Sequence, residues 1–167
     1  MKKKTTLLIT VLALTFTFAV QNAIAQTRIG GFLAYGTEIE TLGLGAVGEF
    51  FVNENIAIAP GLLYFFPKDL GGYDYTWFEI NANGEYYFTT SGSAQVYGLA
   101  GLNFAFVSVD LPAAFGGNAS STEVGLNLGV GSNFDIGSSV LPFAELRFVI
   151  GNADQLVLSG GVKWTLQ

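Results

Sequence analysis

The chain has 167 residues, of which 50% are hydrophobic and only 12% are charged, and it contains no cysteine and no histidine. The absence of cysteine and histidine excludes a disulfide framework, the usual zinc sites and the Ser-His-Asp and Cys-His nucleophile arrangements. The formal net charge of −6 disfavours nucleic acid, which is bound by basic surfaces. A carboxylate-only hydrolase is conceivable, but we expect no enzyme, no cofactor and no metal.

Residues 1–25 have the pattern of a cleaved secretory signal peptide. Lys2, Lys3 and Lys4 are followed by an apolar run at 7–20, and Ala23-Ile24-Ala25 fits a small-x-small cleavage site. An uncleaved anchor is the alternative, but the run is short of the roughly 20 residues that span a bilayer. We therefore predict an exported mature domain, residues 26–167, with four basic residues against thirteen acidic ones and a net charge of −9.

The mature chain is apolar, yet it lacks a run long enough for a membrane helix. The longest candidate, residues 56–67, is about half the required length and contains Pro60 and Gly61. Only helices and closed barrels satisfy all backbone groups inside lipid. The composition therefore favours a transmembrane β-barrel.

We predict eight strands, each about as long as a transmembrane strand, which needs roughly 9–11 residues. They cover residues 27–37, 42–52, 56–66, 75–88, 94–108, 122–134, 140–150 and 155–166. The connections at 53–55, 89–93 and 135–139 are compact and rich in Asn, Gly, Ser and Asp. We assign these turns and both termini to the periplasmic side. The connections at 38–41, 68–74, 110–121 and 151–154 include the two longest, so we assign them to the outside.

Apolar and polar residues alternate along most of these segments. In 75–88, for example, Ile80 and Ala82 oppose Glu79 and Asn81. The segment 56–66 is less clear, because both of its faces are apolar. A soluble sandwich produces the same alternation with the apolar face inward, so periodicity alone does not choose between them.

The heights of the outward aromatic residues favour the membrane. Near the predicted inner rim they are Phe50, Tyr86, Phe88, Phe134 and Trp164; near the outer rim they are Tyr35, Tyr64, Phe66, Phe78, Phe104, Phe106 and Phe148. Two aromatic belts around an aliphatic band are typical of membrane barrels.

The last strand carries a pattern typical of an assembly signal, formed by Ser159, Gly161, Trp164 and Leu166. Together with the segment 97–104 and the eight alternating segments, it resembles the small outer-membrane β-barrel family that includes the OmpA transmembrane domain and OmpX-type proteins. One departure is Gln167, which follows Leu166 where many members end on an aromatic residue. The resemblance implies an all-β, eight-stranded, antiparallel up-and-down barrel in the outer membrane of a Gram-negative bacterium. The expected partners are outer-membrane lipid and lipopolysaccharide, with the barrel assembly machinery during biogenesis, and we expect a monomer.

Residues 43–48 spell the dinucleotide-binding fingerprint G-x-G-x-x-G. That mechanism requires a strand before the glycines and a helix after them, whereas these glycines lie inside an alternating strand. We interpret the inward glycines as making room in a narrow barrel interior.

Charged residues on the inward face form the candidate site. They are Arg28, Glu49, Glu79, Glu85, Glu123, Glu145, Arg147 and Lys163. Charges inside a membrane protein are either paired or functional. Our hypothesis is that Arg147 and Lys163 bridge to Glu49, Glu79, Glu85 or Glu145 and plug the lumen; an ion path is the alternative.

The sequence therefore predicts an integral outer-membrane barrel with a structural or interaction role and a largely plugged lumen. Two alternatives stay open: a narrow porin or small-solute channel, and a soluble periplasmic barrel that carries a hydrophobic ligand. Apolar residues within 110–121 could dock a partner or pack over the barrel mouth. Acidic residues of the outer connections could bind divalent cations; they are Glu38, Glu40, Asp69, Asp74, Asp110 and Asp154.

Overall fold

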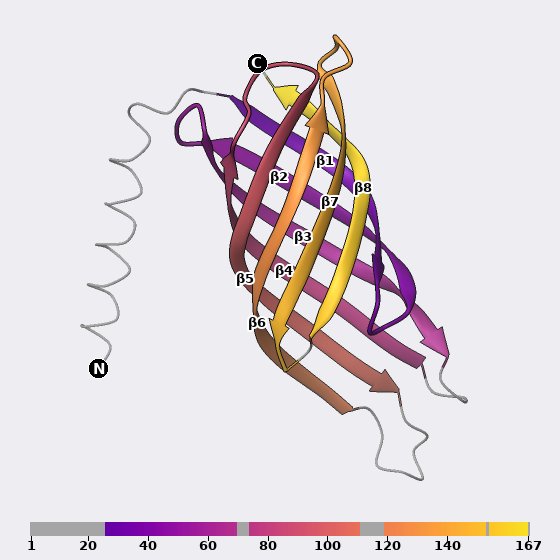
Figure 1. Ribbon diagram of the computed structural model, residues 1–167. Helices are drawn as coiled ribbons and strands as arrows, with labels where there is room; N and C mark the ends of the chain where they lie inside the picture. The colour runs from indigo at the N-terminus through magenta and orange to yellow at the C-terminus, as the bar shows by residue number, and fades with distance from the viewer. Residues whose placement is uncertain (1–25, 70–73, 111–118, 153, 167) are drawn as a thin grey trace, which may run out of the picture.

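The protein is all-β in the computed structural model, which describes residues 26–69, 74–110, 119–152 and 154–166. The predicted signal peptide, residues 1–25, lies outside this range. Figure 1 shows eight strands: β1 (Thr27–Gly36), β2 (Thr41–Phe51), β3 (Ile56–Asp69), β4 (Asp74–Tyr87), β5 (Ala94–Asp110), β6 (Ala119–Phe134), β7 (Val140–Gly151) and β8 (Gln155–Leu166). All eight predicted strands are confirmed. No helix among the described residues is long and apolar enough to cross a membrane.

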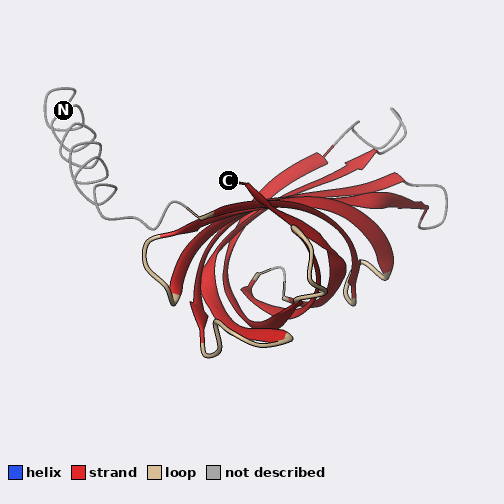
Figure 2. Ribbon diagram, turned by 90° about the horizontal axis from the view of Figure 1, so that it is seen from above, coloured by secondary structure: helices blue, strands red, loops and turns tan. Residues whose placement is uncertain are grey.

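The strands form one closed barrel in which each strand pairs with its neighbours in the sequence, as Figure 2 shows from above. All pairs are antiparallel, and β1 closes the ring against β8, with Thr27 opposite Leu166 and Gly36 opposite Val157. The predicted up-and-down topology is confirmed. Where all eight described strands pair on both sides, closure leaves no open sheet edge, which is the condition for a sheet to lie in lipid.

The connections alternate between the two ends of the barrel as the sequence predicts. The turns at 52–55, 88–93 and 135–139 lie at the same end as the first residue of β1 and the last residue of β8 (Figure 1). Side chains hold these turns together: the Asn53 carboxamide oxygen accepts hydrogen bonds from the backbone N–H groups of Asn55 and Ile56, at 2.9 and 2.8 Å. This is the local chemistry that favours Asn in tight turns.

The apolar face of the barrel points outward. Aliphatic side chains such as Leu44, Leu126 and Val130 are more than half exposed, while inward polar residues of the same strands, such as Glu49 and Asn127, are buried. Every aromatic residue assigned to the two belts is outward-facing, and only Phe78 and Phe104 are partly covered. A soluble barrel would expose polar groups here, so the alternative of a soluble carrier with an apolar interior does not fit.

The strands differ in length at the outer end. β3 continues to Asp69 and β6 begins at Ala119, three residues beyond the predicted bounds in each case. β7 ends at Gly151, opposite Gly125, so the first six residues of β6 pair with β5 alone. Figure 1 shows β5 and β6 reaching past β7 and β8. The hydrogen-bonded ladder thus extends beyond the membrane band, where the apolar pattern that guided the prediction has ended.

Inward glycines make room for large side chains in the narrow interior. A Cβ at Gly45 would overlap the ring of Phe32, and a Cβ at Gly131 would overlap the ring of Tyr97. The fingerprint-like glycines at 43–48 therefore have a packing role within β2, in agreement with their interpretation from the sequence.

Two adjacent glycines of β8 provide a matched test. A Cβ at inward Gly161 would collide with the backbone of Gly31 and Phe32, whereas at outward Gly160 its nearest neighbour is the Phe143 carbonyl oxygen at 3.8 Å. We predict that Gly161→Ala lowers the free energy of unfolding by about 1–3 kcal/mol, the usual cost of overpacking. Gly160→Ala should change it little. Urea unfolding of the refolded protein in lipid vesicles measures both, and equal effects would contradict the packing argument.

Candidate functional site

Side chains form two apolar clusters inside the barrel. One apolar cluster lies toward the outer end and includes Leu63, Phe65 and Trp77. A second lies toward the inner end and consists of Phe51, Ala57, Tyr87, Tyr97 and Leu99. The inward-facing polar and charged residues pack against these clusters and form the candidate site.

Glu49 of β2 is the centre of the inner ion-pair cluster. Arg28 of β1 donates to its Oε2 with Nη1 at 3.3 Å, and Lys163 of β8 donates to its Oε1. The Tyr87 hydroxyl donates to the same Oε1 at 2.9 Å. All three charged side chains are at most 4% exposed. One carboxylate on β2 therefore links β2 to β1 and to β8 and is paired with two positive charges.

Aromatic rings cover the two bases of this cluster. The guanidinium of Arg28 lies 4.8 Å from the ring centroid of Phe51, and the ammonium of Lys163 lies 4.5 Å from that of Phe143. A cation over an aromatic face is stabilised by the ring quadrupole, and more strongly where water is excluded. The rings thus offset part of the cost of burying these charges.

Glu79 of β4 is the centre of the outer ion-pair cluster. Arg147 of β7 donates to Oε2 with Nη2 at 3.0 Å, and the Gln155 amide donates to Oε1 at 2.7 Å. The Trp77 indole N–H and the Asn81 amide also donate to this carboxylate, at 3.1 and 3.3 Å. A fully buried carboxylate is tolerated when its lone pairs are satisfied in this way.

Asparagines of adjacent strands extend the outer cluster toward the middle of the barrel. The amide of Asn127 donates to the carboxamide oxygens of Asn81 and Asn83, both at 2.8 Å, and Asn103 donates to Asn81 at 2.9 Å. These contacts join β4, β5 and β6 through side chains as well as backbone. A cavity of about 20 Å³ adjoins Asn81, Asn83, Arg147 and Lys163 and so lies between the two ion-pair clusters. It has room for about one water molecule.

The structure brings five of the eight predicted charges into ion pairs and leaves three acids outside them. Glu85 and Glu145 accept hydrogen bonds from the hydroxyls of Tyr87 and Tyr97, at 3.2 and 3.0 Å. Glu123 lies apart at the outer mouth, where Asn152 donates to it at 3.1 Å. Within the described ranges none of these three acids forms a salt bridge.

Neutral residues that the hypothesis omitted supply much of the network. They are Trp77, Tyr87, Tyr97, Gln155 and the asparagines. Strand parity could have found them, since each takes an inward position of its strand. The choice of hydrogen-bond partners could not be found this way, because it depends on distances across the barrel.

The residues of the predicted assembly signal lie in β8 next to β1. Trp164 and Leu166 point outward and are each 43% exposed, while Ser159 lines the small interior cavity. Gly161 faces inward opposite Phe32. Recognition of this strand by an assembly machinery stays a prediction.

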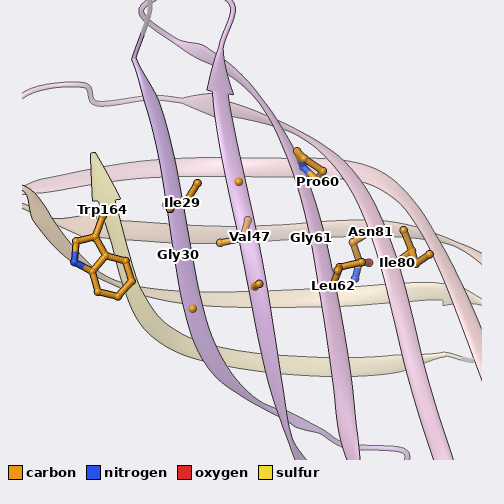
Figure 3. Close-up of a pocket in the computed structure, with 12 residues that line it drawn as sticks. Ile29, Gly30, Val47, Pro60, Gly61, Leu62, Ile80, Asn81 and Trp164 are labelled. Carbon is orange, nitrogen blue, oxygen red and sulfur yellow. The ribbon is translucent and has the colours of Figure 1, made fainter. Parts of the chain in front are cut away.

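A shallow apolar groove of about 510 Å³ runs across the outer wall and is shown in Figure 3. Ile29, Leu62, Ile80 and Trp164 border it, and Pro60 lies along it. The β2–β3 ladder is interrupted here between the pairs Val47–Gly61 and Phe50–Ile58, with its register unchanged. The interruption includes Pro60, which has no N–H to donate. The groove lies in the apolar, outward-facing wall of the barrel, and its described lining is mostly apolar.

The outer mouth contains a pocket of a different kind, with a volume of about 410 Å³. Tyr75, Trp77 and Val107 give it an apolar wall, and Glu38, Glu123 and Asp154 give it three carboxylates. Beside it, Lys68 donates to Glu40 at 2.6 Å. Within the described ranges, no group of three or more Asp or Glu residues is arranged to hold a metal ion.

No protein-family model and no curated protein sequence matches this chain. Solved structures do match it. The N-terminal barrel domain of Pseudomonas aeruginosa OprF aligns with a TM-score of 0.71 at 15% identity, covering 87% of this chain and all of that one. Neisserial surface protein A aligns with a TM-score of 0.64 at 21% identity, covering 84% and 95%. The fold is that of small outer-membrane β-barrels.

A further match is Ail, the attachment invasion locus protein of Yersinia pestis, in complex with the heparin analogue sucrose octasulfate. It aligns with a TM-score of 0.63 at 13% identity and covers 84% of this chain and 97% of that one. These matches, together with the outward apolar band, identify the chain as an integral membrane barrel. At such identities the likeness establishes the fold and leaves the function to the residues of this chain.

The outer ion pair gives a stability prediction. Arg147→Ala should lower the free energy of unfolding by about 3–5 kcal/mol, because it leaves the buried Glu79 carboxylate without a countercharge. The double variant Arg147→Met, Glu79→Gln should recover most of this loss. Lys68→Ala, which removes an exposed pair, is the control and should change little. Urea unfolding in lipid vesicles measures all three, and equal losses for Arg147→Ala and Lys68→Ala would contradict the prediction.

The exposed pair gives a titration prediction. The hydrogen bond and the charge of Lys68 lower the pKa of Glu40 below its usual value of 4.5. Because the folded-state pKa is depressed, the contribution of the pair is present above the unfolded pKa and is lost as the pH falls through the folded one. Carboxyl NMR titration should show that Lys68→Ala raises the pKa of Glu40. An unchanged Glu40 titration would contradict the pairing.

Proposed function

We propose that this protein is a structural or interaction protein of the bacterial outer membrane, with a lumen closed by buried ion pairs and no catalysis. The observation that carries the proposal is the arrangement of charge. The strands bury Glu49 and Glu79 with three bases inside the barrel and present an aliphatic band between two aromatic belts outside. A surface of this kind is covered by lipid.

The geometry of the clusters supports the proposed closure of the lumen. Lys163 and Arg147 reach from β8 and β7 to acids on β2 and β4, so the bridges cross the interior of the barrel. Eight strands leave an interior that side chains can fill. Lipid and lipopolysaccharide are the proposed surroundings, the barrel assembly machinery is the proposed partner during biogenesis, and the proposed state is a monomer.

The interaction role is supported by the charge of the outer end. Besides Lys68, every charged residue of the outer connections and neighbouring strand ends is acidic: Glu38, Glu40, Asp69, Asp74, Asp110, Glu123 and Asp154. Ail was crystallised with a polyanion. An acidic end repels such a ligand and attracts cations, so we propose that the outer ligands of this chain differ in charge from that one.

A narrow channel is the second candidate. It is favoured by Glu85 and Glu145, two acids without a salt bridge to any described residue, which line the small cavity between the ion-pair clusters. Lys163 also lines this cavity. Its ammonium could therefore exchange Glu49 for Glu85 or Glu145 without movement of the barrel wall.

Conductance in a planar lipid bilayer separates the two candidates. We expect the refolded wild-type protein to show no sustained open state, and Arg147→Ala to show brief openings, because one of the two bridges across the interior is lost. Lys68→Ala, outside the lumen, should behave as wild type. Sustained cation-selective conductance of the wild-type protein would overturn the closed lumen and favour the channel.

A further inference from the structure

We propose that the outer end of β6 and the acidic pocket beside it form a binding surface for an extended, basic peptide segment, which adds to the sheet as a strand. This rests on the proposed interaction role and names the chemistry of the partner. Two independent observations carry it: an open sheet edge and a pocket with three carboxylates on an aromatic wall.

The first observation is the open edge, Ala119–Val124. These residues pair with β5 but have no β7 residue opposite them, because β7 pairs with β6 only from Gly125 onward. The segment reads Ala-Ser-Ser-Thr-Glu-Val and has neither the proline nor the lysine that commonly protects an exposed edge. An extended peptide can add to such an edge through backbone hydrogen bonds.

The direction of the free backbone groups follows from the β5–β6 ladder. The Asp135 N–H donates to the Ser93 carbonyl, in the same register as the β5–β6 pairs. Hydrogen-bonded pairs alternate along an antiparallel ladder, so the odd-numbered residues of β6 bond to β5. Even-numbered residues then direct their N–H and C=O groups to the opposite side. At Ser120 and Thr122 that side is the open edge, and both side chains are exposed.

The second observation is the pocket at the foot of this edge. Ser121 and Glu123 of the edge segment line it, as do Gly151 and Asn152 at the end of β7. A strand added to the edge would therefore place alternate side chains over the pocket, since side chains opposite Ser121 and Glu123 share their face. Edge and pocket form one continuous surface.

The charge of the pocket selects the side chain. Among the described residues that line it, Glu38, Glu123 and Asp154 are acidic and none is basic, and Tyr75, Trp77 and Val107 form its wall. A lysine or arginine fits both features, because its alkyl stem packs on apolar surface and its charge is attracted to carboxylates and aromatic faces. The same charge argues against a second copy of this chain, whose edge would carry the same acids.

The test uses a labelled eight-residue peptide of alternating lysine and threonine, and the full barrel refolded in zwitterionic lipid. Fluorescence anisotropy gives the affinity. The chain has two tryptophans, so Trp164→Phe leaves Trp77 in the pocket wall as the reporter of site occupancy. We expect saturable binding that shifts Trp77 emission and weakens with salt, and no binding of the same peptide with glutamate in place of lysine.

Matched variants separate the two parts of the surface. Thr122→Pro removes an N–H from the open edge and should weaken binding about three- to tenfold, the effect of about one net hydrogen bond. Glu38→Gln with Glu123→Gln should weaken it similarly, whereas Glu54→Gln, the same charge change at the inner end, should not. A lysine–threonine peptide with N-methylated backbone tests the edge without altering the protein and should not bind.

Three results would overturn the proposal: equal binding of the lysine and glutamate peptides, undiminished binding of the N-methylated peptide, or a dimer of the unliganded protein that Thr122→Pro converts to a monomer. Undiminished binding of the N-methylated peptide would show that charge alone attracts the peptide. A dimer that Thr122→Pro converts to a monomer would show that the edge serves self-association. Conductance is measured without peptide, so failure of peptide binding and failure of the closed lumen are distinguishable.

Discussion

The whole structure depends on satisfying every backbone hydrogen bond without water. In lipid an unpaired N–H or C=O costs several kcal/mol, so the sheet has to close, and β1 does this by pairing with β8 along its entire length. Closure with eight strands then fixes a narrow interior. From these two conditions follow the outward apolar face, the inward glycines beside Phe32 and Tyr97, and the need to place polar groups in a small space.

The narrow interior makes its charges dependent on one another. Glu49 and Glu79 are each held by several donors from different strands, so the ion pairs act as cross-links between strands inside the barrel. Buried pairs of this kind add little net stability compared with an apolar filling, but removal of one partner is costly. The interior is therefore sensitive to single substitutions in a way that the lipid-facing wall, even at the Pro60 groove, is not.

The outer end is free of these constraints. Above the membrane band the strands are no longer required to end together, and β5 and β6 continue past β7. The result is an open edge beside an acidic, aromatic-walled pocket, in contact with water. The part of the barrel that is least determined by the bilayer is thus the part with the features of a recognition surface.

The sequence by itself determined the eight strands, their order, the end of the barrel at which each turn lies and, outside the apolar segment 56–66, the face to which most residues point. A strand has a period of two, so parity alone assigns Arg28, Glu49, Glu79, Arg147 and Lys163 to the interior. The predicted strand bounds were less accurate at the outer ends of β3 and β6, where hydrogen bonding continues after the apolar pattern stops. Only the tertiary structure decided that Glu49 takes two bases, that Glu85 and Glu145 take tyrosine hydroxyls, and that Glu123 belongs to the mouth. Partner choice depends on the register of eight pairings around a closed ring, and that geometry brings together residues more than a hundred positions apart.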